Sequence, residues 1–586
     1  MASFSRLLSI RQRRGVIISF VLLGESEELF CFMRRFVPFP VMAAGAANSV
    51  LEGRRRDYLY RQTFQNARWF PDCGIINRET AAMRGGKVCS MFTPDRMEFN
   101  ELTKRGNLIP VYREILADRL TPVSAYEKLT AGEPDGVSFL LESVEGGERI
   151  GRYSFLGSNP TLIFRSKGRD AEITEYGLTR TLEIAEGDDP LTHLKRLLGR
   201  YDYVESPDLP RFCGGAVGFF GYDVVRFFEN LPDNNPDDLD VDDACFLFTD
   251  TILIFDHVRH RVKIVCNAHV EGDTRAAYDS AIAKIEAIIA KLRDVPPTIQ
   301  NPKSKIQNIA LKSLFPREEY EAAVRNCVEY ILAGDAFQIV LSQRFKAEFT
   351  APPFDIYRAL RSVNPSPYMF FLSMGPRKLI GTSPEILVTA EQGMVRSRPI
   401  AGTRPRGKDD ADDARLEAEL LADEKERAEH IMLVDLARND VGRVCEYGSV
   451  RVNDLMAIEK YSHVMHIVSD VTGKLRADKD VFDVLRACFP HGTVSGAPKV
   501  RAMQIIDEQE PTRRGFYAGC VGYLSYSGDM DMAITIRTML VDGQTAYLQA
   551  GGGLVADSTP AYEYQECVNK SRALVQAIEL AEAGLE

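Results

Sequence analysis

The charged side chains whose spacing suggests chemistry gather in the second half of the 586-residue chain. Glu563, Glu566 and Lys570 are spaced by three and four residues in a predicted helix over 562–581, so they share one face. Glu429 lies on another predicted helix, over 414–438. Carboxylates from two helices suit Mg²⁺, which takes one or two carboxylates plus water and substrate oxygens. Taken alone, Glu566 and Lys570 also fit an ordinary surface ion pair.

Two further side chains interrupt predicted strands. His466 lies in a strand over 461–471, on the face of Val464 and Val468, while His463 points to the other face. Such a histidine is either a hydrogen-bonded core residue or a catalytic group. Arg537 lies in a strand over 532–541, where a buried guanidinium requires a carboxylate partner from the protein or from a ligand.

The elements that must position these residues show a mixed pattern. Strands are predicted over 138–142, 153–156, 337–345, 461–471, 532–541 and 546–550, and helices over 112–120, 279–292, 317–333, 414–438, 500–507 and 562–581. Because neither strict βαβ alternation nor a fixed repeat is present, the pattern predicts an α+β fold with antiparallel sheets. Residues 294–308, rich in Pro, Asn and Lys, are predicted to link domains over 97–300 and 301–586.

Residues 1–96 differ in composition from the rest of the chain. They carry 14 Arg and one Lys against eight acidic residues, whereas the whole chain has a net charge of −11. We predict that this segment is an extension outside the folded core. It is interpreted either as an organellar transit peptide or as the product of a start codon placed too far upstream, with Met97 as the true first residue.

Composition excludes several classes of protein. The acidic balance argues against a nucleic-acid footprint, and no apolar run approaches the length of a membrane span. The 11 cysteines form no Cys-x-x-Cys pair, which indicates a reducing compartment and no structural zinc. We therefore expect a cytoplasmic protein, or a plastid one if residues 1–96 are a transit peptide.

Six blocks of sequence together resemble the chorismate-utilising enzymes. They are GTSPE at 381–385, PIAGTRPRG at 399–407, AEHIMLVDLARND at 428–440, FPHGTVSGAPKVRAM at 489–503, ITIRT at 534–538 and GGGLVADSTPAYEYQECVNK at 551–570. From Met97 to the C-terminus the chain is most similar to the anthranilate synthase component I branch. The resemblance implies antiparallel sheets packed orthogonally with helices on the outside. It also implies a lyase that converts chorismate and ammonia to anthranilate and pyruvate, the first committed step of tryptophan biosynthesis.

The resemblance also implies roles for individual residues. Glu429 and Glu566 would hold Mg²⁺, with Glu563 helping through water. Glu385 would act as general acid on the departing C4 hydroxyl, and His466 and Thr493 would lie against the ring for the later steps. The residues implied to bind the substrate carboxylates are Tyr517, Arg537, Gly551, Gly552, Gly553 and Lys570.

Two positions distinguish the reactions of this family. Members that hydrate chorismate carry a lysine base where this chain has Gln338, and members that aminate C4 carry a nucleophilic lysine where it has Ala401. Glutamine cannot take a proton from water and alanine supplies no nucleophile, which favours amination at C2 followed by loss of pyruvate. Two alternatives stay open: a 2-amino-2-deoxyisochorismate synthase, which stops before elimination, and a catalytically silent tryptophan-binding regulatory subunit.

Regulation and partners are also implied by the resemblance. LLES at 140–143 and NPSPYMFF at 364–371 match the family's regulatory blocks, which places a site for the inhibitor L-tryptophan in the domain over 97–300. Its residues would be Leu141, Glu142, Ser143, Asn364, Pro365, Pro367, Tyr368 and Met369. Since no cysteine has a Gly-x-Cys-x-Gly setting, ammonia is expected from a separate glutamine amidotransferase subunit, component II, in a heterotetramer.

Overall fold

The computed structural model describes residues 91–143, 151–293, 309–461 and 464–585, together with the backbone of three strands near the N-terminus. Contacts divide the chain into the units Met1–Val88 and Cys89–Glu586. The first unit holds an antiparallel sheet of β1 (Leu7–Arg11), β2 (Ile17–Leu22) and β3 (Leu29–Arg34). The predicted linker 294–308 and His463 lie outside the described residues.

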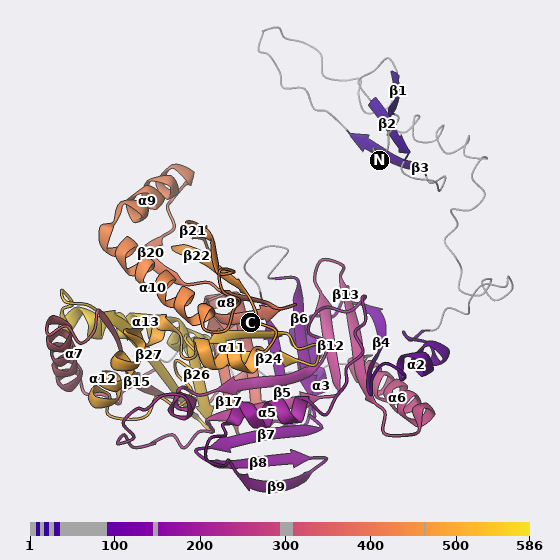
Figure 1. Ribbon diagram of the computed structural model, residues 1–586, viewed down its shortest axis with the longest axis horizontal. Coiled ribbons are helices and arrows are strands. Elements are labelled where there is room, and N and C mark those ends of the chain that lie inside the picture. Colours follow the sequence, from indigo (N-terminus) through magenta and orange to yellow (C-terminus); the bar gives the residue numbers. More distant parts are fainter. Residues whose placement is uncertain are drawn as a thin grey trace. The chain divides into compact units, whose positions relative to one another are not determined.

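The second unit is built on two antiparallel sheets of twelve strands each (Figure 1). Sheet 1 runs in the order β20 (Ile400–Pro405), β22 (Val464–Lys474), β19 (Met394–Ser397), β18 (Ile386–Glu391), β25 (Met530–Ile534), β24 (Cys520–Ser525), β10 (Gly215–Phe220), β11 (Ala244–Thr249), β7 (Leu162–Lys167), β8 (Asp170–Glu175) and β9 (Leu178–Glu183), with β21 (Arg451–Lys460) beside β22.

Sheet 2 runs in the order β14 (Lys312–Ser313), β15 (Gln338–Glu348), β27 (Thr545–Leu554), β26 (Thr538–Asp542), β17 (Arg377–Ser383), β16 (Tyr368–Met374), β5 (Val137–Glu142), β6 (Tyr153–Ser158), β12 (Thr251–Asp256), β13 (Arg261–His269) and β4 (Leu108–Leu116), with β23 (Gly496–Ala497) beside β15. Strands from 97–300 and from 301–586 therefore share both sheets. They meet where β24 pairs with β10 in sheet 1 and where β16 pairs with β5 in sheet 2.

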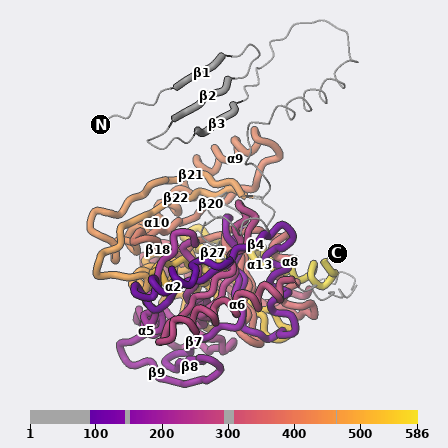
Figure 2. Tube along the Cα trace, turned by 90° about the vertical axis from the view of Figure 1, so that its right-hand side faces the viewer, coloured from indigo at the N-terminus to yellow at the C-terminus, as the bar shows by residue number. Residues whose placement is uncertain are grey.

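Helices surround the two sheets (Figure 1). They are α2 (Arg96–Leu102), α3 (Pro122–Leu129), α5 (Pro190–Leu198), α6 (Thr274–Arg293), α7 (Arg317–Leu332), α8 (Pro353–Val363), α9 (Asp410–Ala422), α10 (Glu424–Gly442), α11 (Val481–Cys488), α12 (Lys499–Gln509) and α13 (Pro560–Ala583), with 3₁₀ turns η2 (Tyr222–Phe227) and η3 (Gly492–Val494). In Figures 1 and 2, α9 lies at one end of this unit and β8 and β9 at the other. The predicted α+β class with antiparallel sheets is confirmed. Within the described residues, no helix combines the length and apolarity needed to cross a membrane.

Three predicted elements are wrong in ways that have a physical cause. The helix predicted over 112–120 is strand β4, because its backbone pairs along its whole length with β13. The helix predicted over 414–438 is broken at Asp423, which ends α9 and begins α10. Its backbone is extended (ψ 110°) and its carboxylate caps α10 by accepting from the amides of Lys425 and Glu426. The strand predicted over 532–541 is two strands, β25 and β26, in different sheets.

The second unit also includes residues that precede Met97. Phe92 is buried, and Thr93 forms a bridge with Tyr112 of β4. The hydroxyl of Tyr278 in α6 donates to the carbonyl of Pro94 at 3.0 Å. The packed unit thus begins before the boundary that composition predicted at residue 97.

Candidate active site

Two adjacent segments connect a strand of one sheet to a strand of the other, and each contains a predicted site residue. Residues 383–386 lead from β17 to β18 and contain Glu385, while residues 535–537 lead from β25 to β26 and contain Arg537. The amide of Ile534 donates to the carbonyl of Glu385 at 3.0 Å, and the amide of Thr382 donates to the carbonyl of Arg537 at 3.1 Å. Arg537 has φ +52°, a left-handed conformation that ends the extended strand. We call these two segments the paired crossings.

Glu385 is a buried carboxyl with few partners. Its side chain is only 7% exposed, and Oε1 lies 3.5 Å from Nδ1 of His491. Burial raises its pKa from 4.5 to about 8, although hydrogen bonds from the Thr493 side chain and the Ile400 amide oppose that shift. At neutral pH Glu385 therefore holds a proton, as a general acid must.

His491 supports this acid, and no role was predicted for it. His491 caps η3, and its Nδ1 lies 2.8 Å from the hydroxyl of Thr493 and accepts from the amide of Thr493 at 3.4 Å. Burial lowers the pKa of His491 to about 3, so the ring is neutral and Nδ1 can accept from the amide of Thr493. The sequence signal for it was the FPHGTVSG block, in which His491 precedes Thr493 by two residues.

Two carboxylates of α13 lie against a glycine of β27, and one carboxylate of α10 is connected to the next glycine through Gln338. A Cβ atom at Gly552 would lie 2.9 Å from Oε2 of Glu563 and 3.6 Å from Oε1 of Glu566. A Cβ atom at Gly553 would lie 2.5 Å from Nε2 of Gln338, and this same nitrogen donates to Oε1 of Glu429 at 2.8 Å. A side chain at Gly552 would therefore collide with Glu563, and one at Gly553 would collide with Gln338, which holds the predicted ligand Glu429.

A second carboxylate on α10 was missed from the sequence. Glu426 precedes Glu429 by three residues, so both lie on one helix face, and a Cβ atom at Gly402 would lie 3.2 Å from its Oε2. Burial and the charge of Glu429 raise the pKa of Glu426. The described residues contain no group of three or more His, Cys, Asp or Glu side chains arranged to hold a metal. An ion that takes only two protein carboxylates does not need such a group.

The predicted cationic residues lie beside these carboxylates. Lys570 donates to the carbonyl of Gly551 at 2.9 Å and pairs with Glu566 at 2.7 Å. Nη1 of Arg537 donates to the carbonyl of Lys570 at 2.8 Å, and a Cβ atom at Gly551 would lie 3.0 Å from the hydroxyl of Tyr517. Burial lowers the pKa of Arg537 against the raising effect of Tyr517 and Glu566. This corner is suited to anion binding, because a buried guanidinium favours a carboxylate partner.

His466 completes the site from β22. Its Nδ1 lies 2.9 Å from the carbonyl of Gly402 and must donate to it, which leaves Nε2 with a free lone pair in the neutral ring. Burial lowers the pKa of His466, and the charge of Arg537 lowers it further. The histidine is therefore a neutral base near the anion-binding corner, with its tautomer fixed by the backbone.

The two predicted regulatory blocks are also neighbours. β5 pairs with β16, which sets Glu142 opposite Met369. The carboxylate of Glu142 is buried and accepts from the hydroxyl of Tyr357 at 2.6 Å and from Nη2 of Arg361 at 3.0 Å. Both of these partners lie on α8, and the sequence pattern gave no indication of either. The blocks thus form one continuous region at a junction of the two halves.

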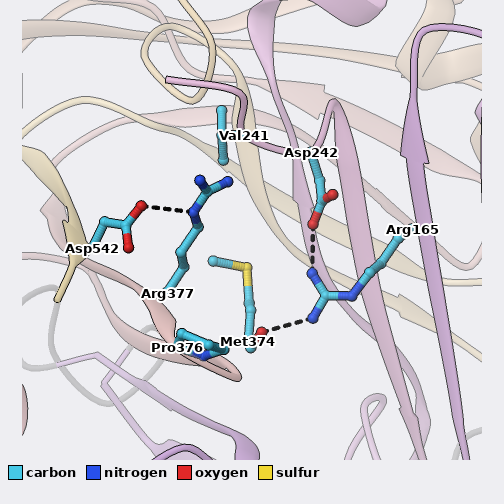
Figure 3. Close-up of a pocket in the computed structure, with 7 residues that line it drawn as sticks. All are labelled: Arg165, Val241, Asp242, Met374, Pro376, Arg377 and Asp542. Atoms are coloured by element: carbon cyan, nitrogen blue, oxygen red, sulfur yellow. Dashed lines mark hydrogen bonds and ion pairs between the residues drawn. The ribbon is translucent and has the colours of Figure 1, made fainter. Parts of the chain in front are cut away.

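A separate pocket lies away from these residues (Figure 3). Arg165 and Arg377 line it, and their guanidiniums pair with Asp242 at 2.5 Å and with Asp542 at 3.0 Å. Its other lining residues are Val241, Met374 and Pro376. No predicted site residue lines this pocket, so it is not part of the candidate active site.

Comparisons with known proteins agree with the fold, and the segment that they match contains the candidate site residues. Residues 136–576 match the family described as chorismate binding enzyme. Anthranilate synthase component 1 from Acetivibrio thermocellus is 47% identical over 497 residues, 84% of this chain and 99% of the relative. The protein of that name from Aquifex aeolicus is 48% identical over 490 residues, 83% of this chain and 98% of the relative.

Solved structures give the same result. Anthranilate synthase component I from Streptococcus pneumoniae TIGR4 aligns with a TM-score of 0.65 and 36% identity, over 79% of this chain and 99% of that one. The menaquinone-specific isochorismate synthase from Escherichia coli aligns with a TM-score of 0.60 and 19% identity, over 82% of this chain and 98% of that one, which supports the fold alone. The chain therefore belongs to the chorismate-binding enzymes and, within them, to the anthranilate synthase component 1 lyases.

Proposed function

We propose that this protein converts chorismate and ammonia to anthranilate, pyruvate and water, as the first committed step of tryptophan biosynthesis. The observation that carries the proposal is Glu385, a buried carboxyl whose raised pKa keeps it protonated beside Thr493 and His491. Chorismate must lose its C4 hydroxyl, and a hydroxyl leaves as water only when it receives a proton. The relatives that carry the name of this activity match nearly their full length.

The chemistry of the carboxylates on α10 and α13 suits Mg²⁺. Glu429 and Glu566 would hold the ion directly, and Glu563, which lies at Gly552, would act through water. When bound, Mg²⁺ supplies positive charge that offsets the ring carboxylate of a dianionic substrate. Gln338 orients Glu429 through the 2.8 Å hydrogen bond and so prepares one ligand before the ion arrives.

The remaining residues bind substrate and move protons. Arg537, Tyr517 and Lys570, with the backbone of Gly551 to Gly553, would bind the substrate carboxylates. As ammonia adds at C2, Glu385 gives its proton to the departing C4 hydroxyl. His466 would then accept the C2 proton at Nε2 while the bond from C3 to the enolpyruvyl oxygen breaks, which leaves an aromatic ring. The departing enolpyruvate takes a proton from solvent at its methylene carbon and becomes pyruvate.

Ammonia would reach this site from a glutamine amidotransferase subunit, component II, in a heterotetramer. The basis is the sequence, in which no cysteine has the setting of an amidotransferase nucleophile. L-tryptophan would inhibit by binding at the regulatory blocks around Leu141 to Ser143 and Asn364 to Met369. The cysteines among the described residues are buried and free, which suits a reducing compartment such as the cytoplasm.

The test uses the purified full chain with chorismate, Mg²⁺ and a large excess of ammonium near neutral pH, where Glu385 keeps its proton, so that no partner is required. We expect anthranilate fluorescence and an equal amount of pyruvate, both abolished by EDTA and restored by excess Mg²⁺. Consumption of chorismate without pyruvate would instead indicate a 2-amino-2-deoxyisochorismate synthase. No consumption, with tryptophan still bound, would indicate a catalytically silent regulatory subunit.

A further inference from the structure

The second regulatory block contacts both sheets close to the paired crossings. Nδ2 of Asn364 donates to Oγ1 of Thr382 in β17 at 2.9 Å, on the sheet 2 side. The hydroxyl of Tyr368 donates to Oδ1 of Asp531 in β25 at 2.9 Å, on the sheet 1 side. Each contact lies on the strand that leads into one crossing. The block is therefore hydrogen-bonded to both strands from which the site residues Glu385 and Arg537 continue.

Thr382 has the more direct connection of the two. It is fully buried and lies three residues before Glu385 on the same segment. Its amide donates to the carbonyl of Arg537, the residue with φ +52°. The side chain of Thr382 thus contacts the regulatory block while its backbone holds the opposite crossing. A single residue joins Asn364 to both of the crossings that carry the acid and the guanidinium.

We propose that Thr382 is a positioning residue that transmits occupancy of the tryptophan site to the chorismate site. This inference rests on the feedback inhibition given under Proposed function. A ligand that reorients Asn364 changes the hydrogen bond that holds Thr382, and the rigid pairing of the crossings carries the change to Arg537 and Glu385. The Tyr368 hydroxyl provides a second, parallel contact through Asp531.

Coupling of this kind is reciprocal and can be measured without catalysis. If tryptophan weakens the binding of chorismate, chorismate weakens the binding of tryptophan by the same factor. The coupling factor is the ratio of the tryptophan dissociation constants with and without saturating chorismate. With Mg²⁺ but no ammonia or glutamine, chorismate is not aminated, so titration calorimetry on the full chain gives this ratio directly.

The informative variant is Thr382→Val, which keeps the shape and the backbone amide but removes the hydroxyl that accepts from Asn364. We expect the coupling factor to fall about five-fold, the equivalent of one buried hydrogen bond. Thr382→Ser, which keeps the hydroxyl, should restore it. The matched control is Thr472→Val in β22, whose hydroxyl accepts from Nδ2 of Asn453 at the same 2.9 Å but far along the chain from the regulatory block. This control should keep the wild-type coupling factor.

The outcomes separate this inference from the function on which it rests. Wild-type protein that binds no tryptophan would overturn both. Tryptophan binding with an unchanged coupling factor in Thr382→Val, or an equal fall in Thr472→Val, would overturn the role of Thr382 and leave feedback inhibition standing. If Thr382→Val does not fold, Tyr368→Phe tests the other contact with the same ratio. A coupling factor unchanged in Tyr368→Phe would remove the parallel contact from the proposal, and Thr382→Ala, which lacks the same hydroxyl, then tests Thr382 itself: an unchanged factor there would overturn its role.

Discussion

Replacing Glu385 with glutamine isolates the proposed acid. The amide keeps the size of the side chain and its capacity for hydrogen bonding to Thr493 and the Ile400 amide, but it carries no acidic proton. General acid catalysis contributes roughly 10²–10⁴-fold to a rate, so we expect kcat for anthranilate formation to fall by that factor. Glu391→Gln, at the far end of β18, the strand that follows Glu385, is the matched control: Glu391 pairs with Arg211, and the variant should stay close to wild type.

The size of the pKa shift at Glu385 sets a second expectation. A pKa raised from 4.5 to about 8 means that ionising this group in the folded protein costs about 5 kcal/mol more than in the unfolded chain. Between these values the folded protein holds a proton that the unfolded chain has released. Stability contributed by this group is therefore present below pH 4.5 and lost as the pH rises through 8. From pH 6 to pH 8 the free energy of unfolding of Glu385→Gln should gain about 2 kcal/mol on wild type.

Two assays test the catalytic role of Glu385 and its protonation state separately. Fluorescence of anthranilate at pH 7, with ammonium and Mg²⁺, measures the loss of catalysis. Infrared difference spectra of wild type minus Glu385→Gln should show a carboxylic acid carbonyl band at pH 6 that disappears near pH 8. A variant that keeps kcat within ten-fold would refute the acid role. A carboxylate band already present at pH 6 would refute the protonation argument, whatever the variant's activity.

Three further changes test other parts of the site. Gly553→Ala places a methyl group against Gln338 and should break the hydrogen bond from Gln338 to Glu429. The Mg²⁺ concentration for half-maximal activity should therefore rise by at least about ten-fold. An unchanged concentration would contradict the assignment of Glu429 as a ligand. Because burial lowers the pKa of His466, wild-type activity should decline only below the ordinary histidine pKa of 6.5. His466→Ala should lose this decline at acidic pH and should lower kcat about a hundred-fold. If the decline at acidic pH is retained, another group is the base. In Arg537→Lys the ammonium cannot form the two parallel hydrogen bonds that a guanidinium gives to a carboxylate, so KM for chorismate should rise about ten-fold or more. A change in kcat alone would exclude a role of Arg537 in substrate binding.

Much of the fold could be predicted from local sequence. Helical periodicity gave α6, α7 and α13 to within a few residues, and alternation gave β15. Strand β4 was not predictable in this way, because its conformation follows from pairing with β13, which comes some 150 residues later. The break at Asp423 had a signal, an aspartate followed by acidic residues in a first helical turn, that should have been interpreted as a helix start.

In the candidate site, too, some residues could be predicted from local sequence and others depend on tertiary contacts. Motifs identified Glu385, Glu429, Glu566 and Lys570, which the structure brings around β27 and the crossings. They could not show that Arg537 adopts φ +52° at a passage between two sheets, since its β-branched neighbours favour a continuous strand. The burial that keeps Glu385 protonated depends on surrounding elements and leaves no local pattern.

The way the two halves share their sheets gives the proposed regulatory block a physical connection to the candidate active site. If each half had its own sheets, a ligand at β5 could act only through a hinge. Here β5 pairs directly with β16, and β16 pairs with β17, the strand that ends in Thr382 and Ser383 before Glu385. A shift of the regulatory block must therefore either move the strands that end in the crossings or break the hydrogen bonds between those strands. Breaking these hydrogen bonds would leave buried backbone amides without partners. Moving the strands costs less than breaking the ladder, so the shared sheets themselves favour transmission to Glu385.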